Sequence, residues 1–316
     1  MRILTLLCAL VVYVQSYADP SISGYFNTEY FDKETSEPYY DMHHFNIMIA
    51  HEIGKFRMFA ELEFEHAPSQ VDGGVNSRGK ILSERAWGEF NHNNYFNVRM
   101  GQMLNGTLYQ QNHYPSITPN IARPQLVKKI FDGDLEGIRF FGDIGYGLKY
   151  EVEKGQAPGT TDKKHLGFAL SYGLNAGGVD VEVTARSATY HTAGAGADTD
   201  PTATGFELNL NWKDLTIWAE SAAKTNTDES VDATGTYAIL SYEFDLGKPG
   251  TLTPFYLHDS FHDKPATTDA IVKSGIGLTY RPEPQISIKL ENLSTAEYDS
   301  VEATSQWGIG FVYFYN

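Results

Sequence analysis

Residues 56–65 have the sequence FRMFAELEFE, in which apolar and charged side chains alternate. The apolar positions are Phe56, Met58, Ala60, Leu62 and Phe64. The charged positions are Arg57, Glu61, Glu63 and Glu65. Because successive side chains of a β-strand point to opposite faces of a sheet, this pattern predicts a strand with one apolar face and one charged face.

The same alternation recurs along most of the chain. It is clear at 146–153, 179–183, 206–212 and 286–291, where large apolar residues occupy one parity and polar residues the other. We count about sixteen such segments, most of them close to the length of about nine to eleven residues that a tilted strand needs to cross hydrocarbon. Their expected bounds are 21–32, 41–53, 56–66, 81–90, 95–103, 135–142, 146–154, 164–173, 178–191, 203–213, 215–224, 235–245, 251–259, 270–281, 286–293 and 305–316.

The connections between these segments alternate in length. Short connections such as 54–55 and 143–145 are followed by longer polar ones such as 71–80 and 192–202. Short periplasmic turns and long extracellular loops are typical of outer-membrane barrels, and closure removes the sheet edges that lipid cannot satisfy. We therefore predict an all-β protein, a transmembrane antiparallel β-barrel of about sixteen strands whose polar interior holds water.

The placement of basic residues supports a barrel whose charged face points to the lumen and whose apolar face points to lipid. Each basic residue at the lipid midplane costs about 2–4 kcal/mol, so we expect the bases on the polar parity to face the lumen. These are Arg57, Arg99, Arg139, Lys149, Arg186 and Lys289.

Residues 1–18 carry the features of a secretory signal peptide. Arg2 precedes an apolar stretch over 3–14, and Ser16 and Ala18 are small residues at the positions that a signal peptidase requires. We predict cleavage after Ala18, which leaves 19–316 as the barrel domain. The only cysteine, Cys8, lies in the removed part, so the mature chain is expected to contain no cysteine.

Composition excludes several classes of protein. The chain has 24 Lys and Arg against 40 Asp and Glu, a formal charge of −16 that does not suit a nucleic-acid binder. The chain contains no apolar run of the roughly 18 residues that a transmembrane helix requires. No G-x-S-x-G, H-E-x-x-H, phosphate-loop, C-x-x-C-H or dinucleotide-binding motif is present. The neighbouring His43 and His44 should point to opposite faces of their strand, so we expect no shared metal there. We predict a protein that is not an enzyme and has no cofactor.

The longest connection, 104–134, is expected to fold into the barrel and narrow it. Opposed charges in a narrow throat select solutes by size and charge. The expected basic side comprises Arg57, Arg85, Arg99, Arg139, Arg123, Lys128 and Lys129. The expected acidic residues are Glu61, Glu63, Glu65, Glu89, Asp132 and Asp134. The alternative is that these charges only form the solvated wall of a wide channel.

Four short motifs resemble the phosphate-selective porin O and P family and its general-porin relatives. They are LSERAWGEF at 82–90, VRMGQM at 98–103, ARP at 122–124 and GIRFFG at 137–142. The resemblance implies a trimeric sixteen-stranded channel with basic residues at its eyelet, and it assigns that role to Arg99 and Arg123. The last segment, 305–316, resembles the terminal strand that bacterial barrel proteins present to their assembly machinery.

These observations together predict a porin of the Gram-negative cell outer membrane that passes ions and small hydrophilic solutes. Its expected partners are the lipid bilayer, lipopolysaccharide and two further copies of the chain, and no nucleic acid. Three alternatives remain open: a channel that prefers phosphate-like anions, a barrel enzyme, and a secreted β-sandwich that binds glycans.

Overall fold

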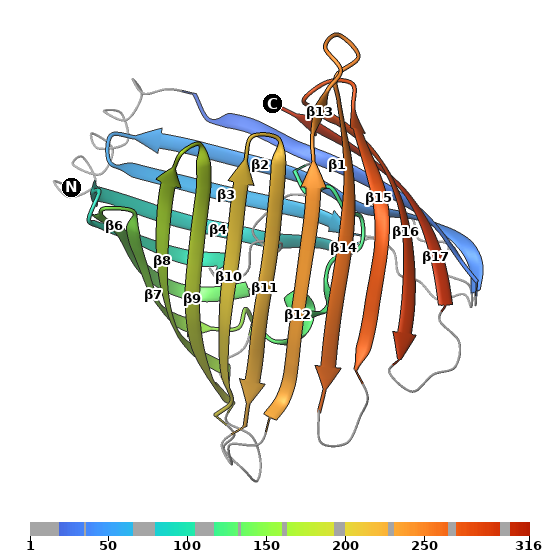
Figure 1. Ribbon diagram of the computed structural model, residues 1–316. Helices are drawn as coiled ribbons and strands as arrows, with labels where there is room; N and C mark the ends of the chain where they lie inside the picture. Colours follow the sequence, from blue (N-terminus) through green and yellow to red (C-terminus); the bar gives the residue numbers. More distant parts are fainter. Residues whose placement is uncertain are drawn as a thin grey trace, which may run out of the picture.

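The alternating segments form one antiparallel sheet that closes on itself (Figure 1). The structure is a computed structural model that describes residues 19–34, 36–65, 80–104, 117–131, 134–159, 163–192, 200–226, 231–264, 270–297 and 304–316. Strand β1 (Ser21–Lys33) pairs with β2 (Ser36–Ile53) on one side and with the last strand, β17 (Thr304–Tyr315), on the other. Closure of the barrel is therefore complete. A β-sandwich would need two separate sheets, so this alternative is excluded.

The barrel wall has sixteen strand positions, as predicted. The other full strands are β3 (Phe56–Glu65), β4 (Lys80–Asn93), β5 (Phe96–Leu104), β6 (Asp134–Gly145), β7 (Leu148–Gln156), β8 (Lys163–Ala176), β9 (Val179–Thr192), β10 (Thr202–Trp212), β11 (Leu215–Thr225), β12 (Val231–Tyr242), β14 (Thr251–Asp263), β15 (Ile271–Arg281) and β16 (Ile286–Glu297). The two-residue β13 (Phe244–Asp245) continues β12, and both pair with β14. All sixteen expected segments are confirmed as strands, and β2 is extended most, beginning at Ser36.

One end of the barrel carries short turns between strands, as predicted. Short turns over 54–55, 94–95, 146–147, 177–178 and 213–214 join strands at one end. At the turn formed by Tyr146 and Gly147, both residues have positive φ, 54° and 82°. Positive φ at both central residues is the geometry of the type I′ hairpin, which matches the twist of the two strands.

Side-chain parity divides the barrel into an apolar outside and an inside that carries the charges. On β8, Phe168 and Leu170 are about half exposed at 51% and 50%, whereas the inward His165 is buried. Among the inward bases, Arg139 and Lys289 are buried. Among the described residues, no helix is long and apolar enough to cross a membrane.

The interior is not polar throughout, which corrects our expectation. The segment 117–131, here called the inward segment, lies inside the ring of strands and contains the short helix α3 (Gln125–Lys129) (Figure 1). Its buried Leu126, Val127, Ile130 and Phe131 join a hydrophobic cluster. The wall residues of this cluster are Ala188, Tyr190, Ala203, Trp218, Ala222, Ala233, Tyr237, Ile239, Phe255, Leu257, Phe261 and Leu293. The inner face is apolar where the inward segment covers it, because that face is shielded from water.

Candidate constriction site

Buried side chains of the wall bind the backbone of the inward segment. The ammonium group of Lys289 donates a hydrogen bond to the carbonyl of Asn120 at 3.0 Å. The carboxylate of Glu291 accepts hydrogen bonds from the backbone N–H groups of Ile121 at 2.9 Å and Ala122 at 3.2 Å. Because a buried backbone group without a partner costs free energy, these contacts allow an irregular segment to lie inside the barrel.

Two further polar contacts hold the segment on either side of this point. The hydroxyl of Thr279 donates to the carbonyl of Pro119 at 2.6 Å. The backbone N–H of Gln125, the first residue of α3, donates to the carboxylate of Asp259 at 2.8 Å. The inward segment is therefore fixed to β14, β15 and β16 through its backbone.

Small residues in the wall make room for α3. A Cβ atom added at Gly235 would lie 2.9 Å from the Cβ of Leu126, and one added at Gly205 would lie 3.3 Å from the ring of Phe131. The first distance is shorter than side chains tolerate. The glycine at position 235 therefore permits the close packing of α3 against β12.

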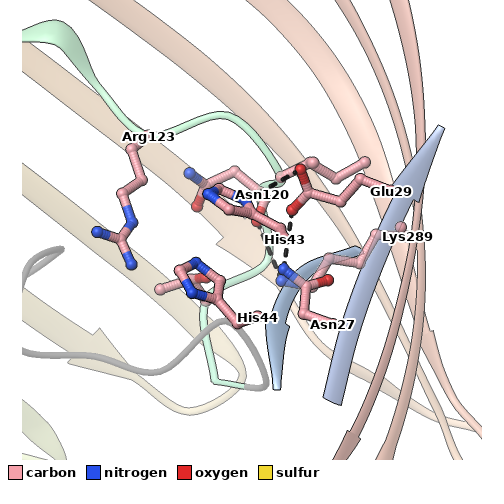
Figure 2. Close-up of a pocket in the computed structure, with 10 residues that line it drawn as sticks. Asn27, Glu29, His43, His44, Asn120, Arg123 and Lys289 are labelled. Atoms are coloured by element: carbon pink, nitrogen blue, oxygen red, sulfur yellow. Dashed lines mark hydrogen bonds and ion pairs between the residues drawn. The ribbon is translucent and has the colours of Figure 1, made fainter. Parts of the chain in front are cut away.

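The other side of the inward segment faces β1 and β2 across a pocket (Figure 2). Arg123, Asn120 and Thr118 contribute to its lining from the segment, and His43 and His44 contribute from β2. Figure 2 shows the side chain of Arg123 extending from the segment toward the imidazole of His44. No ion pair joins Arg123 to another residue within the described part of the chain.

Each of the two histidines contacts a carboxylate. The Nδ1 atom of His43 lies 3.3 Å from Glu29, which also accepts a hydrogen bond of 2.9 Å from Asn27. His44 contacts Glu63 on β3 in the same manner. The pocket therefore combines the two imidazoles and their carboxylate partners with the guanidinium of Arg123 and the ammonium of Lys289.

A β-bulge brings His43 and His44 to the same face, which corrects our expectation that they point apart. Asn27 pairs with His44, but Glu29 pairs with Asp41, so β2 contains one extra residue between these positions. The two imidazole rings stack with centroids 4.0 Å apart and an interplanar angle of 20°. An extra residue in one strand turns a side chain from its regular face. No group of three or more metal-ligating side chains gathers among the described residues.

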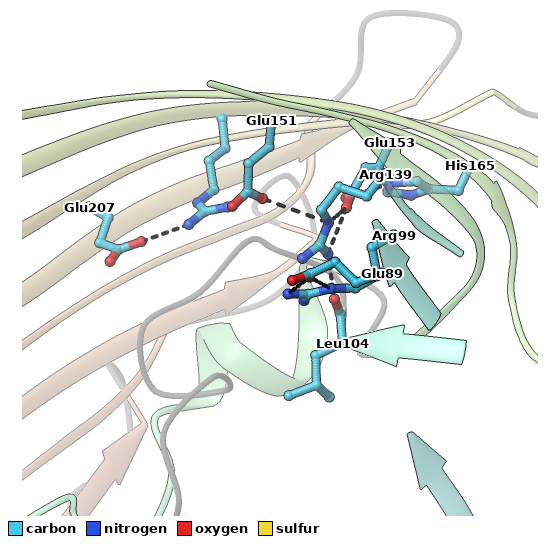
Figure 3. Close-up of polar contacts among 9 residues, drawn as sticks. Glu89, Arg99, Leu104, Arg139, Glu151, Glu153, His165 and Glu207 are labelled. Carbon is cyan, nitrogen blue, oxygen red and sulfur yellow. Dashed lines mark hydrogen bonds and ion pairs between the residues drawn. The ribbon is translucent and has the colours of Figure 1, made fainter. Parts of the chain in front are cut away.

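A row of ion pairs lies along the inner wall from β3 to β10, and Figure 3 shows the part from Glu89 on β4 to Glu207 on β10. It includes four pairs between neighbouring strands: Arg85 Nε to Glu61 at 2.6 Å, Arg99 Nε to Glu89 at 2.7 Å, Arg139 Nη2 to Glu153 at 2.8 Å and Arg186 Nη2 to Glu207 at 3.4 Å. His165 also contacts Glu153, at 2.9 Å. Acidic and basic residues are thus interleaved on one wall. Their cross-strand pairing neutralises most of this wall locally.

Aromatic rings hold several of these arginines flat against the wall. The guanidinium of Arg85 lies 5.0 Å from the ring centroid of Phe59, and that of Arg99 lies 4.1 Å from Trp87. Arg57, which is exposed, lies 5.6 Å from the same Trp87 ring. Such cation–π contacts restrict the arginine side chains to the wall.

The predicted site residues are partly brought together. Arg57, Arg85, Arg99, Arg139, Glu61, Glu63 and Glu89 lie on the inner parity of β3–β6. Arg123 lies on the inward segment, Lys129 is exposed on α3, and Asp134 begins β6. Asp132 and the side chains of Glu65 and Lys128 lie outside the described residues.

Sequence reasoning missed the residues that place the segment and shape the pocket. Lys289 was correctly expected to face inward, but its contact with the segment 169 positions earlier was not. Glu29 and Glu291 were not singled out, and His43 and His44 were considered only as metal ligands. Glu291 could have been identified because it is an acidic residue on the polar parity of its strand. The bulge at His43 leaves no periodic pattern in the sequence, so the inward position of this side chain could not have been identified.

The comparisons with known proteins concern the fold. No family model and no curated protein matches the chain. The anion-selective porin from Comamonas acidovorans superimposes with a TM-score of 0.70 at 11% identity, covering 94% of this chain and 99% of that one. OprB of Pseudomonas putida gives 0.74 at 7% identity, covering 94% of each chain. The trimer form of OmpT, an outer membrane protein of Vibrio cholerae, gives 0.63 at 11%, covering 94% and 99%. The chain has the fold of these outer-membrane barrels.

Proposed function

We propose that this protein is a porin of the Gram-negative outer membrane, through which ions and small hydrophilic solutes diffuse passively. The barrel presents an apolar outer face to lipid, and its charged residues line the inside. The solved structures that share this fold include a protein described as an anion-selective porin. Residues 1–18 act as the signal peptide in this proposal, and the mature barrel contacts lipid and lipopolysaccharide and assembles as a trimer.

The observation that carries the proposal is the anchored inward segment. Its backbone is bound by Lys289 and Glu291 on one side, and Arg123 faces the pocket on the other. A segment held in this way occupies part of the barrel lumen beside β12, β14, β15 and β16. In this proposal the constriction lies where the inward segment faces β1 and β2 across the pocket that Arg123 lines.

The charge at this constriction favours one finer proposal, a preference for anions. Arg85, Arg99, Arg139 and Arg186 are matched by carboxylates on neighbouring strands. Arg123 has no such match among the described residues, so its field extends into the lumen. A general anion preference follows from this arrangement more directly than selectivity for phosphate.

Conductance in planar lipid bilayers tests the porin proposal. The purified mature protein should be refolded in detergent, checked by heat-modifiable gel mobility and added to one side of the bilayer. We expect stepwise current increases, and vesicles containing the protein should swell in solutions of small sugars but not of large dextrans. A folded barrel that leaves the bilayer silent and the vesicles unswollen would refute the proposal.

A further inference from the structure

We propose that His43 and His44 set the charge selectivity of the constriction, and that the channel gains anion preference when the two imidazoles take up protons. This inference rests on the porin function proposed above. It adds two specificity-determining residues and a dependence on pH.

The geometry places both histidines at the pocket that Arg123 faces. The β2 bulge turns His43 to the inner face beside His44, and the rings stack 4.0 Å apart. Both side chains line the same pocket as Arg123 (Figure 2). His43 is more open to water, with 27% of its side chain exposed, whereas 7% of the His44 side chain is exposed. A proton bound at either ring therefore changes the charge of the pocket that Arg123 lines, which is the proposed constriction.

Charged groups from six other elements surround this pair. They are Glu29 on β1, Glu61 and Glu63 on β3, Arg85 and Glu84 on β4, Arg123 on the inward segment, and Lys289 and Glu291 on β16, with Asp41 on β2 itself and Asp134 on β6 behind Glu84. Arg85 is matched by Glu61, and Lys289 and Glu291 bind the backbone of the inward segment. Glu29 and Glu63 are the carboxylates that contact the imidazoles of His43 and His44 directly.

The sign of the effect follows from these two pairs. When the imidazoles are neutral, Glu29 and Glu63 keep their negative charges at the pocket, opposing the positive charge of Arg123. When the imidazoles are protonated, each imidazole–carboxylate pair becomes neutral overall and the charge of Arg123 dominates. Histidine is the side chain that commonly changes its charge between pH 5 and 8. Lowering the pH over this range should therefore favour anions.

The size of the effect depends on salt. One unit charge about 6 Å from a permeating ion changes the local concentration of that ion by about threefold in water. The screening length falls from about 30 Å at 0.01 M salt to about 3 Å at 1 M, so the effect should be largest in dilute salt. We expect the chloride-to-potassium permeability ratio to rise at least about threefold between pH 8 and pH 5.

Reversal potentials under a dilute potassium chloride gradient test the proposal. They should be measured at pH 8, 6.5 and 5 for the wild type, for His43→Gln, for His44→Gln and for the double variant. His191→Gln is the matched control, because His191 pairs with Asp200 near the loop end of β9. We expect the control to show the full shift of the wild type, each single variant to show a smaller one, and the double variant to show almost none.

Protonation of acidic residues near the two histidines would be a competing explanation for a pH-dependent change in selectivity. Glu84 lies beside Glu63, so Glu84→Gln should be tested in parallel and is expected to retain the shift. A full shift in the double variant, or its loss in Glu84→Gln alone, would overturn the assignment to the histidines. A wild-type channel that conducts with no pH-dependent shift would also overturn it, whereas a silent bilayer would count against the porin function itself. If His44→Gln fails to fold, the more exposed His43→Gln still tests the proposal, because it must reduce the shift.

Discussion

Removing the carboxylate of Glu291 should loosen the constriction while leaving the barrel intact. Glu291 accepts two backbone hydrogen bonds from the inward segment, at 2.9 and 3.2 Å. A hydrogen bond to a charged group contributes about 1.5–3 kcal/mol, so Glu291→Ala should weaken the docking of residues 121–123 by about 3–6 kcal/mol. The apolar side chains of α3 keep their contacts with the wall, so the loosened part is the stretch that carries Arg123.

Two matched variants separate anchoring from charge. Glu291→Gln removes the same negative charge as Glu291→Ala but keeps one neutral acceptor, so it should loosen the segment less. Glu283→Ala removes an exposed carboxylate from the turn at 282–285 and should change nothing at the constriction.

The assay is the noise of the open single-channel current. We expect current fluctuations to increase in the order wild type and Glu283→Ala, then Glu291→Gln, then Glu291→Ala. All four proteins should show the same heat-modifiable mobility. Equal noise in Glu291→Ala and Glu291→Gln would refute the anchoring role, because only the lost hydrogen bonds distinguish these two variants.

Three further changes test other parts of the structure. Arg123→Glu should lower the chloride-to-potassium permeability ratio, because its positive charge has no matching carboxylate among the described residues; an unchanged reversal potential would exclude Arg123 from the constriction. Leu170→Lys on the outer face of β8 should destabilise the barrel in lipid vesicles by about 2–4 kcal/mol, as measured by urea unfolding. Ala169→Lys, which faces the lumen, should cost much less, and equal losses would contradict the assigned faces. Gly235→Leu should displace α3, because even its Cβ atom would lie 2.9 Å from that of Leu126; a changed conductance is expected, and an unaltered one would show that α3 does not pack there.

The strands and their orientation could be predicted from the sequence because lipid imposes a strict period of two. On β3, for example, Met58 and Leu62 face outward and Glu61 and Glu63 face inward, as the alternation required. An error of one residue would place charges in hydrocarbon at a cost of several kcal/mol, so the pattern is unambiguous. The inward course of the connection 104–134 was expected from its length and from the analogy with sixteen-stranded porins, and its residues 117–131 do lie inside the barrel (Figure 1).

Features that depend on register could not be predicted. A bulge adds one residue without changing composition, so the stretch around His43 and His44 looked like regular strand. A second bulge on β4, where Glu61 pairs with Arg85 and Leu62 with Ser83, decides which acid meets which base. The individual ion pairs along this wall therefore could not be predicted from the sequence.

The apolar inner wall has a different cause. On β12, Tyr237 and Ile239 face inward while Ala238 and Leu240 face outward, so both faces are apolar and the period of two is lost. The inner face is apolar because α3, more than 100 residues earlier in the chain, packs against it. A contact so distant in sequence leaves no local signal.

Chemical modification of a single cysteine at position 123 tests the constriction most directly. The mature chain is expected to contain no cysteine, so Arg123→Cys introduces one reactive thiol. A negatively charged, membrane-impermeant thiosulfonate added to an open channel should reduce its current in one step, and Lys213→Cys on a short turn should show no such step. Complete labelling of the cysteine at position 123, verified by mass spectrometry, with an unchanged current would contradict the position assigned to the inward segment.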